Sequence, residues 1–381
     1  MIPYGRQDIR QEDIDEVVET LRSDFLTQGP KVPEFERSVA EATGASFAVA
    51  SNSATSSLHV ACQSLGLGPG DLMWTSPITF VASANVGHWC GADVDFVDIE
   101  PDTCNMSARA LADKLLQAKK DDRLPKIIMP VHMCGLSADM ASIGELAKEF
   151  GVSVVEDASH AIGGKFGNQP VGSCAHSDIA VFSFHPVKIV TTAEGGIGTT
   201  QSEELAKKMQ LYRSHGVTRD TTLYQGEDHG AWYYQQLELG LNYRMTELQA
   251  ALGVSQMTRL EEYVARRNAL ADRYDQLLTG LPLERPGRRD NAYSAYHLYV
   301  IRVEAARRRE VFDHLRANGI GVNVHYIPVH TQPYWKRFGF NDGQFPASED
   351  YYARAISIPL YPGMTHEDQD EVVRVLSEAL V

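Results

Sequence analysis

The sequence has few cysteines, a shortage of positive charge and no long apolar run. Its five cysteines are scattered, without a CxxC pair or histidines at structural-zinc spacing, which argues for reduced interior thiols and against a metal site. Lys and Arg number 35 against 50 Asp and Glu, so the net charge of −15 repels polyanions and argues against a nucleic-acid partner. No apolar run reaches the ~18 residues that cross a bilayer, and residues 1–12 are polar where a signal peptide needs an apolar core. We therefore expect a soluble, cytoplasmic protein that does not bind membranes.

A dinucleotide-binding fingerprint is also missing. The glycine-rich cluster at residues 66–71 precedes a predicted strand, whereas the fingerprint joins a strand to a helix and needs an acidic residue about 20 positions later. This absence argues against a nicotinamide-dependent oxidoreductase. No basic tract or DNA-binding helix pair is visible either, which argues against a regulator of transcription.

What the chain does have is a regular alternation of short β-rich runs with amphipathic segments of helical length. This alternation predicts an α/β fold around a mainly parallel sheet flanked by helices. The predicted strands are residues 47–51, 72–75, 94–99, 127–131, 153–155, 179–184 and 197–200. The predicted helices between them are residues 55–65, 80–90, 108–118 and 140–150.

The rhythm changes after residue 245. A long helix is predicted first, followed by a strand, a basic helix, a second strand and a final helix, at residues 247–278, 297–303, 305–318, 321–325 and 367–380. We interpret residues 1–245 as a large domain and residues 246–381 as a smaller C-terminal α/β domain that includes the long connecting helix.

The most informative motif is Phe182-Ser183-Phe184-His185-Pro186-Val187-Lys188, which follows an apolar strand, with Asp157 located 31 residues before the lysine. A lysine amine can hold the aldehyde of pyridoxal 5'-phosphate (PLP) as a Schiff base, while a carboxylate keeps the pyridine nitrogen protonated. Taken singly, Lys188 also fits a solvated surface lysine, and Asp157 also fits a turn residue. The pair predicts a PLP site.

Further residues match what this cofactor needs. The segment from Asn52 to Leu58 is rich in hydroxyls and opens a helix after a strand, which suits a phosphate, although it also fits an ordinary helix cap. Ser183 is a second hydroxyl candidate for the phosphate. Phe80 is a candidate for stacking on the pyridine ring, and His160 for contacting its phenolic oxygen, although each residue also fits an interior role.

These residues carry a family resemblance over essentially the whole chain. The sequence resembles the sugar-nucleotide aminotransferases, a branch of the PLP fold type I enzymes. The matching motifs are Leu26-Thr27-Gln28-Gly29-Pro30, Glu156-Asp157-Ala158-Ser159-His160-Ala161, Ser183-Phe184-His185 with Lys188, Glu194-Gly195-Gly196, Arg213-Ser214-His215-Gly216, Gly240-Leu241-Asn242-Tyr243-Arg244-Met245, His325-Tyr326-Ile327-Pro328 and Ser357-Ile358-Pro359-Leu360.

The resemblance implies roles for individual residues. It implies that Lys188 is the Schiff-base lysine, that Asp157 is the partner of the pyridine nitrogen, and that the phosphate is held by Ser183 with Ala54, Thr55 and Ser56. It further implies that Asn242 reaches the cofactor phosphate of a neighbouring subunit, and therefore a homodimer with shared active sites.

Within this family the motifs are most similar to the transaminases of pseudaminic acid synthesis, which implies a UDP-linked 4-keto-6-deoxy-N-acetyl sugar of the L-altro series as acceptor and L-glutamate as donor. A 3-keto sugar, or a dTDP- or GDP-linked one, is the alternative. Lys31, Arg219, Arg244 and His325 are the candidates for substrate contacts. A non-catalytic PLP-binding regulator also stays open, and an absorption spectrum that changes with glutamate would distinguish it from a transaminase.

Overall fold

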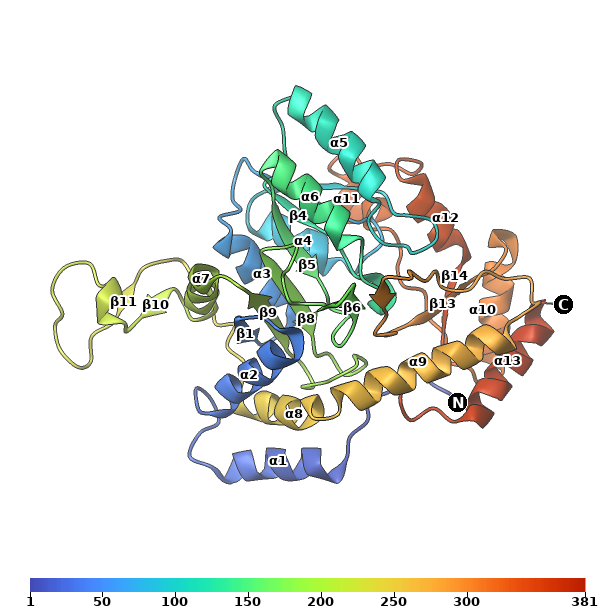
Figure 1. The fold of residues 1–381 in the computed structure, drawn as a ribbon, viewed down its shortest axis with the longest axis horizontal. Coiled ribbons are helices and arrows are strands. Elements are labelled where there is room, and N and C mark those ends of the chain that lie inside the picture. The colour runs from blue at the N-terminus through green and yellow to red at the C-terminus, as the bar shows by residue number, and fades with distance from the viewer. Residues whose placement is uncertain (381) are drawn as a thin grey trace.

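A seven-stranded sheet forms the centre of the fold in the computed structural model, which describes residues 1–380 (Figure 1). Five neighbouring strands run parallel in the order β3, β2, β4, β5 and β8, and β9 lies antiparallel between β8 and the edge strand β1. The strands of this sheet are β1 (Phe47–Ser51), β2 (Leu72–Thr75), β3 (Asp93–Phe96), β4 (Ile127–Met129), β5 (Ser153–Asp157), β8 (Ile179–Ser183) and β9 (Gly196–Thr200). The predicted α/β fold with a mainly parallel sheet is confirmed.

Helices cover both faces of the sheet, because successive residues of a strand point to opposite faces. Met73 and Val155 pack in one cluster with side chains of α3, α4 and α7, whereas their neighbours Trp74 and Val154 pack in another with side chains of α5 and α6. The helices that flank the sheet are α2 (Lys31–Thr43), α3 (Ala54–Ser64), α4 (Ala82–Trp89), α5 (Ala108–Lys120), α6 (Met140–Phe150) and α7 (Glu203–Arg213).

The C-terminal part has its own core, which joins α9, α10 and α13 to the antiparallel pair of β13 and β14. The main helices and strands after residue 246 are α8 (Glu247–Met257), α9 (Leu260–Leu277), β13 (Tyr299–Arg302), α10 (Arg308–Ala317), α11 (Pro333–Lys336), α12 (Pro346–Arg354), β14 (Ala355–Ile358) and α13 (His366–Leu380). Helix α8 instead packs with α2 in the core beside β8 and β9. The division of the chain into two domains between residues 245 and 246 stays a prediction. Val381, the last residue of the predicted C-terminal domain, lies outside the described residues.

Two elements of the C-terminal part differ from the prediction. The helix expected over residues 247–278 is two helices, because Arg259 leaves the helical conformation between α8 and α9. The strand expected over residues 321–325 is reduced to a single bridge between Asn323 and Ser357. There the side chain of Asn323 accepts from the Val324 N–H at 2.8 Å, and the ring of His325 forms a hydrogen bond with the Ser357 hydroxyl. These side-chain contacts compete with the backbone hydrogen bonds that a longer pair of strands would form.

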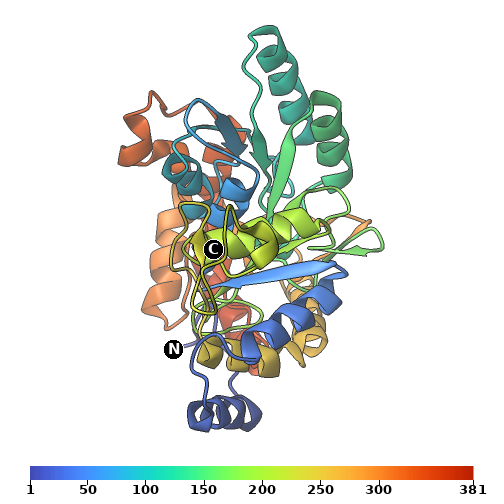
Figure 2. The same ribbon diagram turned by 90° about the vertical axis from the view of Figure 1, so that its left-hand side faces the viewer.

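Three peripheral segments complete the fold. Helix α1 (Gln11–Arg22) packs along α8 and lies at the opposite end from α5 in the turned view (Figure 2). The short strands β10 (Val217–Thr218) and β11 (Gln235–Gln236) form a hairpin that protrudes beyond α7 (Figure 1). A three-stranded ribbon is made by β6 (Lys165–Phe166), β7 (Gln169–Pro170) and β12 (Ala292–Tyr293). Within residues 1–380, no helix combines the length and the apolar character needed to cross a membrane.

Candidate active site

The carboxyl ends of the parallel strands meet at one edge of the sheet, and a cavity of about 450 Å³ opens there. Asp157 ends β5, Ser183 ends β8, and the loop after β1 leads into α3. The predicted site residues that line this cavity are Ala54, Thr55, Phe80, Asp157, His160, Ser183, Lys188 and His325. Sequence positions that span more than half of the chain are thus brought together.

Lys188 lies in the turn after β8, where its N–H donates to the His185 carbonyl at 2.9 Å. The buried neighbours Ile189 and Val190 anchor this turn in the core. Burial lowers the pKa of Lys188 to about 8, and the negative charge of Asp157 opposes that shift. The neutral form, which a nucleophile or a general base requires, is therefore far more populated at neutral pH than in an ordinary lysine.

The carboxylate of Asp157 is buried and held by two donors. The Ser83 hydroxyl donates to Oδ2 at 2.6 Å, and the backbone N–H of Ser159 donates to Oδ1 at 3.1 Å. Ser83 is fixed in turn by the Thr79 hydroxyl at 2.7 Å. The orientation of the carboxylate is therefore set by a hydroxyl in the first turn of α4 and by a backbone N–H in the loop after β5.

The start of α3 provides an anion site. Ser53 caps the helix by accepting from the Ser56 N–H at 3.1 Å, and helix geometry leaves the N–H groups of Ala54 and Thr55 without an intrahelical acceptor. A Cβ at Gly196 on β9 would collide with the backbone of Ser53 and Ala54, so glycine permits this loop to lie close to the sheet. Ser56 does not line the cavity, and its hydroxyl donates to the Asn52 side chain at 2.6 Å.

Three histidines of low basicity line the same cavity. Burial and the nearby Lys188 lower the pKa of His160 and of His297 well below the usual value, and they lower that of His325 to about 4. The Nε2 atom of His160 lies 3.1 Å from the Tyr326 hydroxyl, while its Nδ1 atom is buried without a partner. These rings are neutral at neutral pH and can act as hydrogen-bond donors or acceptors.

Several lining residues were not predicted. Tyr4, His297 and Tyr326 come from three distant segments, and none has a local sequence signal for this cavity. Tyr326 lies within a motif that the resemblance covers, but nothing in the sequence singles it out. Ser53 belongs to the predicted phosphate segment, and the other unpredicted polar residues of the lining are Thr79, Ser83, Ser159, His185 and Glu194.

Besides Ser56, four predicted residues do not line the cavity of their own chain. Asn242 is exposed, and its carbonyl lies 3.4 Å from the Asn52 side-chain nitrogen. Lys31 forms ion pairs with Glu16 and Glu34 at the start of α2. Arg219 lies in the loop that joins β10 to β11, and Arg244 lies in the loop between β11 and α8. Lys188 is the one Lys or Arg in the lining, so the substrate contacts predicted for these cations stay predictions.

The residues present fit pyridoxal phosphate. Free N–H groups at a helix start suit its phosphate, the buried carboxylate of Asp157 suits a protonated ring nitrogen, and the unpartnered Nδ1 of His160 leaves a polar atom for a ligand to satisfy. With the α/β fold and a lysine of lowered pKa in the same cavity, these features define a PLP-dependent aminotransferase. The chain belongs to the DegT/DnrJ/EryC1/StrS aminotransferase family, whose sequence profile matches residues 7–377.

Similar proteins match this chain over nearly its full length. The spore coat polysaccharide biosynthesis protein SpsC of Bacillus subtilis is 38% identical, over 99% of this chain and 96% of its own. A UDP-4-amino-4,6-dideoxy-N-acetyl-beta-L-altrosamine transaminase of Campylobacter jejuni is 35% identical, over 97% of this chain and 94% of its own. The structure of Helicobacter pylori PseC, an aminotransferase of pseudaminic acid biosynthesis, superposes with a TM-score of 0.91 at 30% identity, covering 100% of this chain and 99% of its own.

The cofactor follows from the family. PLP- and PMP-forms of Spr1654 from Streptococcus pneumoniae have been solved, and the PMP-form superposes with a TM-score of 0.91 at 30% identity, covering 100% of this chain and 99% of its own. The protein is therefore a PLP-dependent sugar aminotransferase.

Proposed function

We propose that this enzyme transfers an amino group from L-glutamate to C4 of a UDP-linked 4-keto-6-deoxy-N-acetyl sugar of the L-altro series, in the synthesis of pseudaminic acid or a related surface glycan. The altrosamine transaminase and PseC similarities support this substrate. The similarity to SpsC, a spore coat polysaccharide biosynthesis protein, also supports other sugars of surface polysaccharides as substrates. A 3-keto sugar, or a dTDP- or GDP-linked one, is therefore the second candidate. The cytoplasmic location stays a prediction.

The observation that carries the proposal is the composition of the cavity. Lys188, with a pKa of about 8, shares the cavity with the carboxylate of Asp157 and with aromatic, imidazole and hydroxyl side chains. PLP, when bound, supplies an electron sink that lets an amino group pass from one substrate to the other. The neutral amine of Lys188 takes the proton from Cα of the amino donor, and the same amine, in its protonated form, delivers a proton to C4 of the sugar in the second half-reaction.

The other predicted residues have holding roles in this proposal. Asp157 keeps the ring nitrogen charged, and Ser183 with the N–H groups at the start of α3 holds the phosphate. Phe80 stacks on the ring, and its exposed fraction of 59% leaves a face free for that contact. His160 contacts the phenolic oxygen.

A homodimer with shared sites is part of the same proposal. Asn242 does not line the cavity of its own chain, although its carbonyl lies next to the side chain of Asn52, the first residue of the predicted phosphate segment. An exposed asparagine so close to one site suits a contact with the site of a second copy. Trp232 and Leu239 support such an interface, because they lie in the protruding β10–β11 region and expose 76% and 80% of their surface.

The test is an assay of purified protein with PLP, L-glutamate and a panel of UDP-, dTDP- and GDP-linked 4-keto and 3-keto sugars. We expect amination of the UDP-linked 4-keto-6-deoxy-N-acetyl sugar, no turnover by Lys188→Ala, and unchanged turnover by the matched surface variant Lys165→Ala. Borohydride should fix the cofactor to the unchanged protein but not to Lys188→Ala. Preference for a 3-keto or dTDP-linked sugar would refute the substrate, and fixation of PLP to Lys188→Ala would refute the role of this lysine.

A further inference from the structure

The N-terminal segment before α1 contributes to the wall of the active-site cavity. Its backbone pairs with the C-terminal part of the chain: the Ile2 N–H donates to the Gly319 carbonyl at 2.9 Å, and the Gly321 N–H donates to the Ile2 carbonyl at 2.6 Å. Two residues further on, the Tyr4 carbonyl accepts from the Leu360 N–H at 3.1 Å. These contacts bring the side chain of Tyr4 to the cavity, where it joins the lining.

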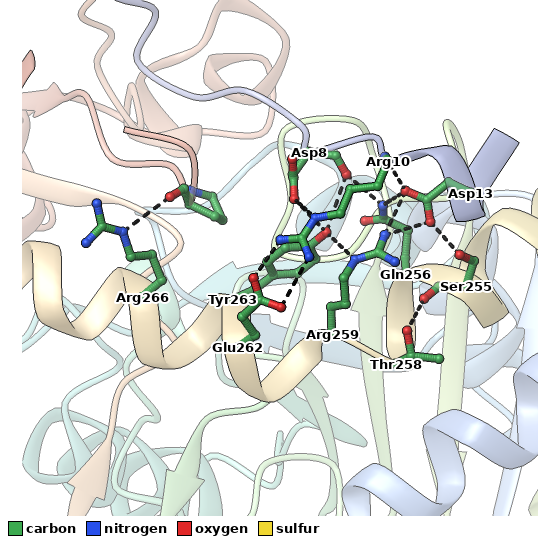
Figure 3. A network of polar contacts seen from close by, with 11 residues as sticks. Asp8, Arg10, Asp13, Ser255, Gln256, Thr258, Arg259, Glu262, Tyr263 and Arg266 are labelled. Atoms are coloured by element: carbon green, nitrogen blue, oxygen red, sulfur yellow. Dashed lines mark hydrogen bonds and ion pairs between the residues drawn. The ribbon is translucent and has the colours of Figure 1, made fainter. Parts of the chain in front are cut away.

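The other end of the segment is fixed by a buried polar network (Figure 3). Asp13 in the first turn of α1 exposes 1% of its surface and accepts from both Arg259, at 2.7 Å, and Ser255, at 2.6 Å. The Tyr263 hydroxyl meets the carboxylate of Asp8 at 3.1 Å. Because the segment is held on both sides, Tyr4 has a defined place in the cavity wall.

The neighbours of Tyr4 are neutral and aromatic. Its ring centroid lies 5.5 Å from that of His325, and the amide of Asn323 reaches the Tyr4 hydroxyl. The Nδ2 atom of Asn323 in turn lies 3.4 Å from Nε2 of His325. Burial raises the pKa of Tyr4, so its hydroxyl stays protonated.

The neutral side chains around Tyr4 suit the keto sugar better than the amino donor. A dicarboxylate donor needs cations, and Lys188 is the one Lys or Arg in the cavity lining. A sugar ring presents hydroxyls, an amide and apolar C–H faces, which suit neutral hydrogen-bonding groups and aromatic rings. The part of the wall made by Tyr4 and His325 therefore matches a sugar better than an amino acid.

We propose that Tyr4 is a sugar-contacting residue, whose ring and hydroxyl help to select the acceptor without serving the amino donor. This inference rests on the proposed function, because it requires a sugar in this cavity. Tyr4 lies before residues 7–377, the part of the chain that matches the family.

The test separates the two half-reactions of the holoenzyme. Tyr4→Phe keeps the ring and loses the hydroxyl, and we expect it to raise the KM for the nucleotide keto sugar by about 3- to 10-fold. Tyr4→Ala should lower kcat/KM for the sugar by about 10- to 100-fold. For both variants, the glutamate half-reaction followed by absorbance, the affinity for PLP and the melting temperature should match the unchanged protein. Tyr293→Phe, at an exposed tyrosine outside the cavity, is the matched control.

Three results would overturn the inference. The first is an unchanged KM for the sugar in both Tyr4 variants, with the unchanged protein fully active. The second is an equal loss in the glutamate half-reaction, which would mean that Tyr4 supports the site as a whole. The third is a lack of turnover of every keto sugar by the unchanged protein, which would refute the proposed function together with this inference.

Discussion

At the scale of the residue, Lys188 shows how the active site costs stability. Burial lowers its pKa from 10.5 to about 8, so between these values the unfolded chain binds more protons than the folded chain. The penalty is complete below pH 8 and disappears as the pH rises through 10.5. Its size is up to about 3 kcal/mol, at 1.36 kcal/mol for each pKa unit.

We therefore predict that Lys188→Met stabilises the cofactor-free protein at pH 7, and that the gain shrinks at pH 10. The measurement is the melting temperature of both proteins, freed of PLP, at the two pH values. Lys165→Met replaces an exposed lysine and should change little at either pH. An equal gain for Lys188→Met at pH 7 and pH 10 would contradict the desolvation of this amine.

A second prediction concerns the carboxylate of Asp157. Asp157→Asn keeps its size but removes the charge that stabilises a protonated ring nitrogen, so the glutamate half-reaction should slow by at least about 100-fold. Single-turnover absorbance measures this rate. Ser83→Ala removes one hydrogen bond and leaves the charge, and should slow the same step by about 10-fold at most. Near-normal single turnovers in Asp157→Asn would remove this residue from the role.

The sequence predicted fewer than half of the polar residues that line the cavity, but it predicted Lys188 and Asp157 among them. Lys188 and Asp157 were found because each follows a strand whose carboxyl end lies at the same sheet edge. Tyr4 and His297 were missed because tertiary packing alone brings them near His160, whose ring centroid lies 4.4 Å from that of His297. A single sequence has no periodic signal for such contacts.

At the scale of the element, α1 depends on one buried ion pair (Figure 3). Burial alone would raise the pKa of Asp13, but hydrogen bonds from Arg259, Ser255 and Gln256 outweigh it and lower the pKa. Asp13→Ala would leave Arg259 buried without its partner, and we expect a loss of about 3–5 kcal/mol. The midpoint of urea unfolding at pH 7 measures this loss.

The control for Asp13 is an exposed ion pair in the same network. Glu262 pairs with Arg10 at 2.6 Å on the surface, where water screens the charges, so Glu262→Ala should cost much less than Asp13→Ala. Because the pKa of Asp13 is lowered on folding, its contribution is present above the unfolded value of 3.8 and is lost as the pH falls below it. Equal losses in the two variants would contradict the importance of the buried pair.

The elements were predicted unevenly. Short buried strands such as β1 and β2 were predicted to the residue, since strongly apolar runs between turns mark them clearly. The break between α8 and α9 was missed, because it depends on Arg259 turning toward Asp13, which lies 246 residues away in the sequence. Helices α1, α2 and α7 were not predicted, and α1 and α7 are rich in charged residues that obscure a short apolar stripe.

At the scale of the whole molecule, the cavity of the described chain has residues that fit the cofactor, but Lys188 is the one Lys or Arg in its lining. The predicted cations Lys31 and Arg219 lie outside the cavity of their own chain. A protruding hairpin with exposed Trp232 and Leu239 gives a second copy an apolar surface to cover. A two-fold dimer would place equivalent residues of each chain against the other.

Mixing two inactive variants tests this shared site. Asn242→Ala should weaken PLP retention, and Lys188→Ala should abolish turnover, so each homodimer has two defective sites. In a heterodimer, the lysine of the first chain meets the asparagine of the second, which restores one site of two. After subunit exchange at equal amounts, half of the dimers are mixed, and activity should return to about one quarter of the unchanged enzyme. If mixed dimers form, as two distinct tags can verify, and no activity returns, Asn242 serves the site of its own chain.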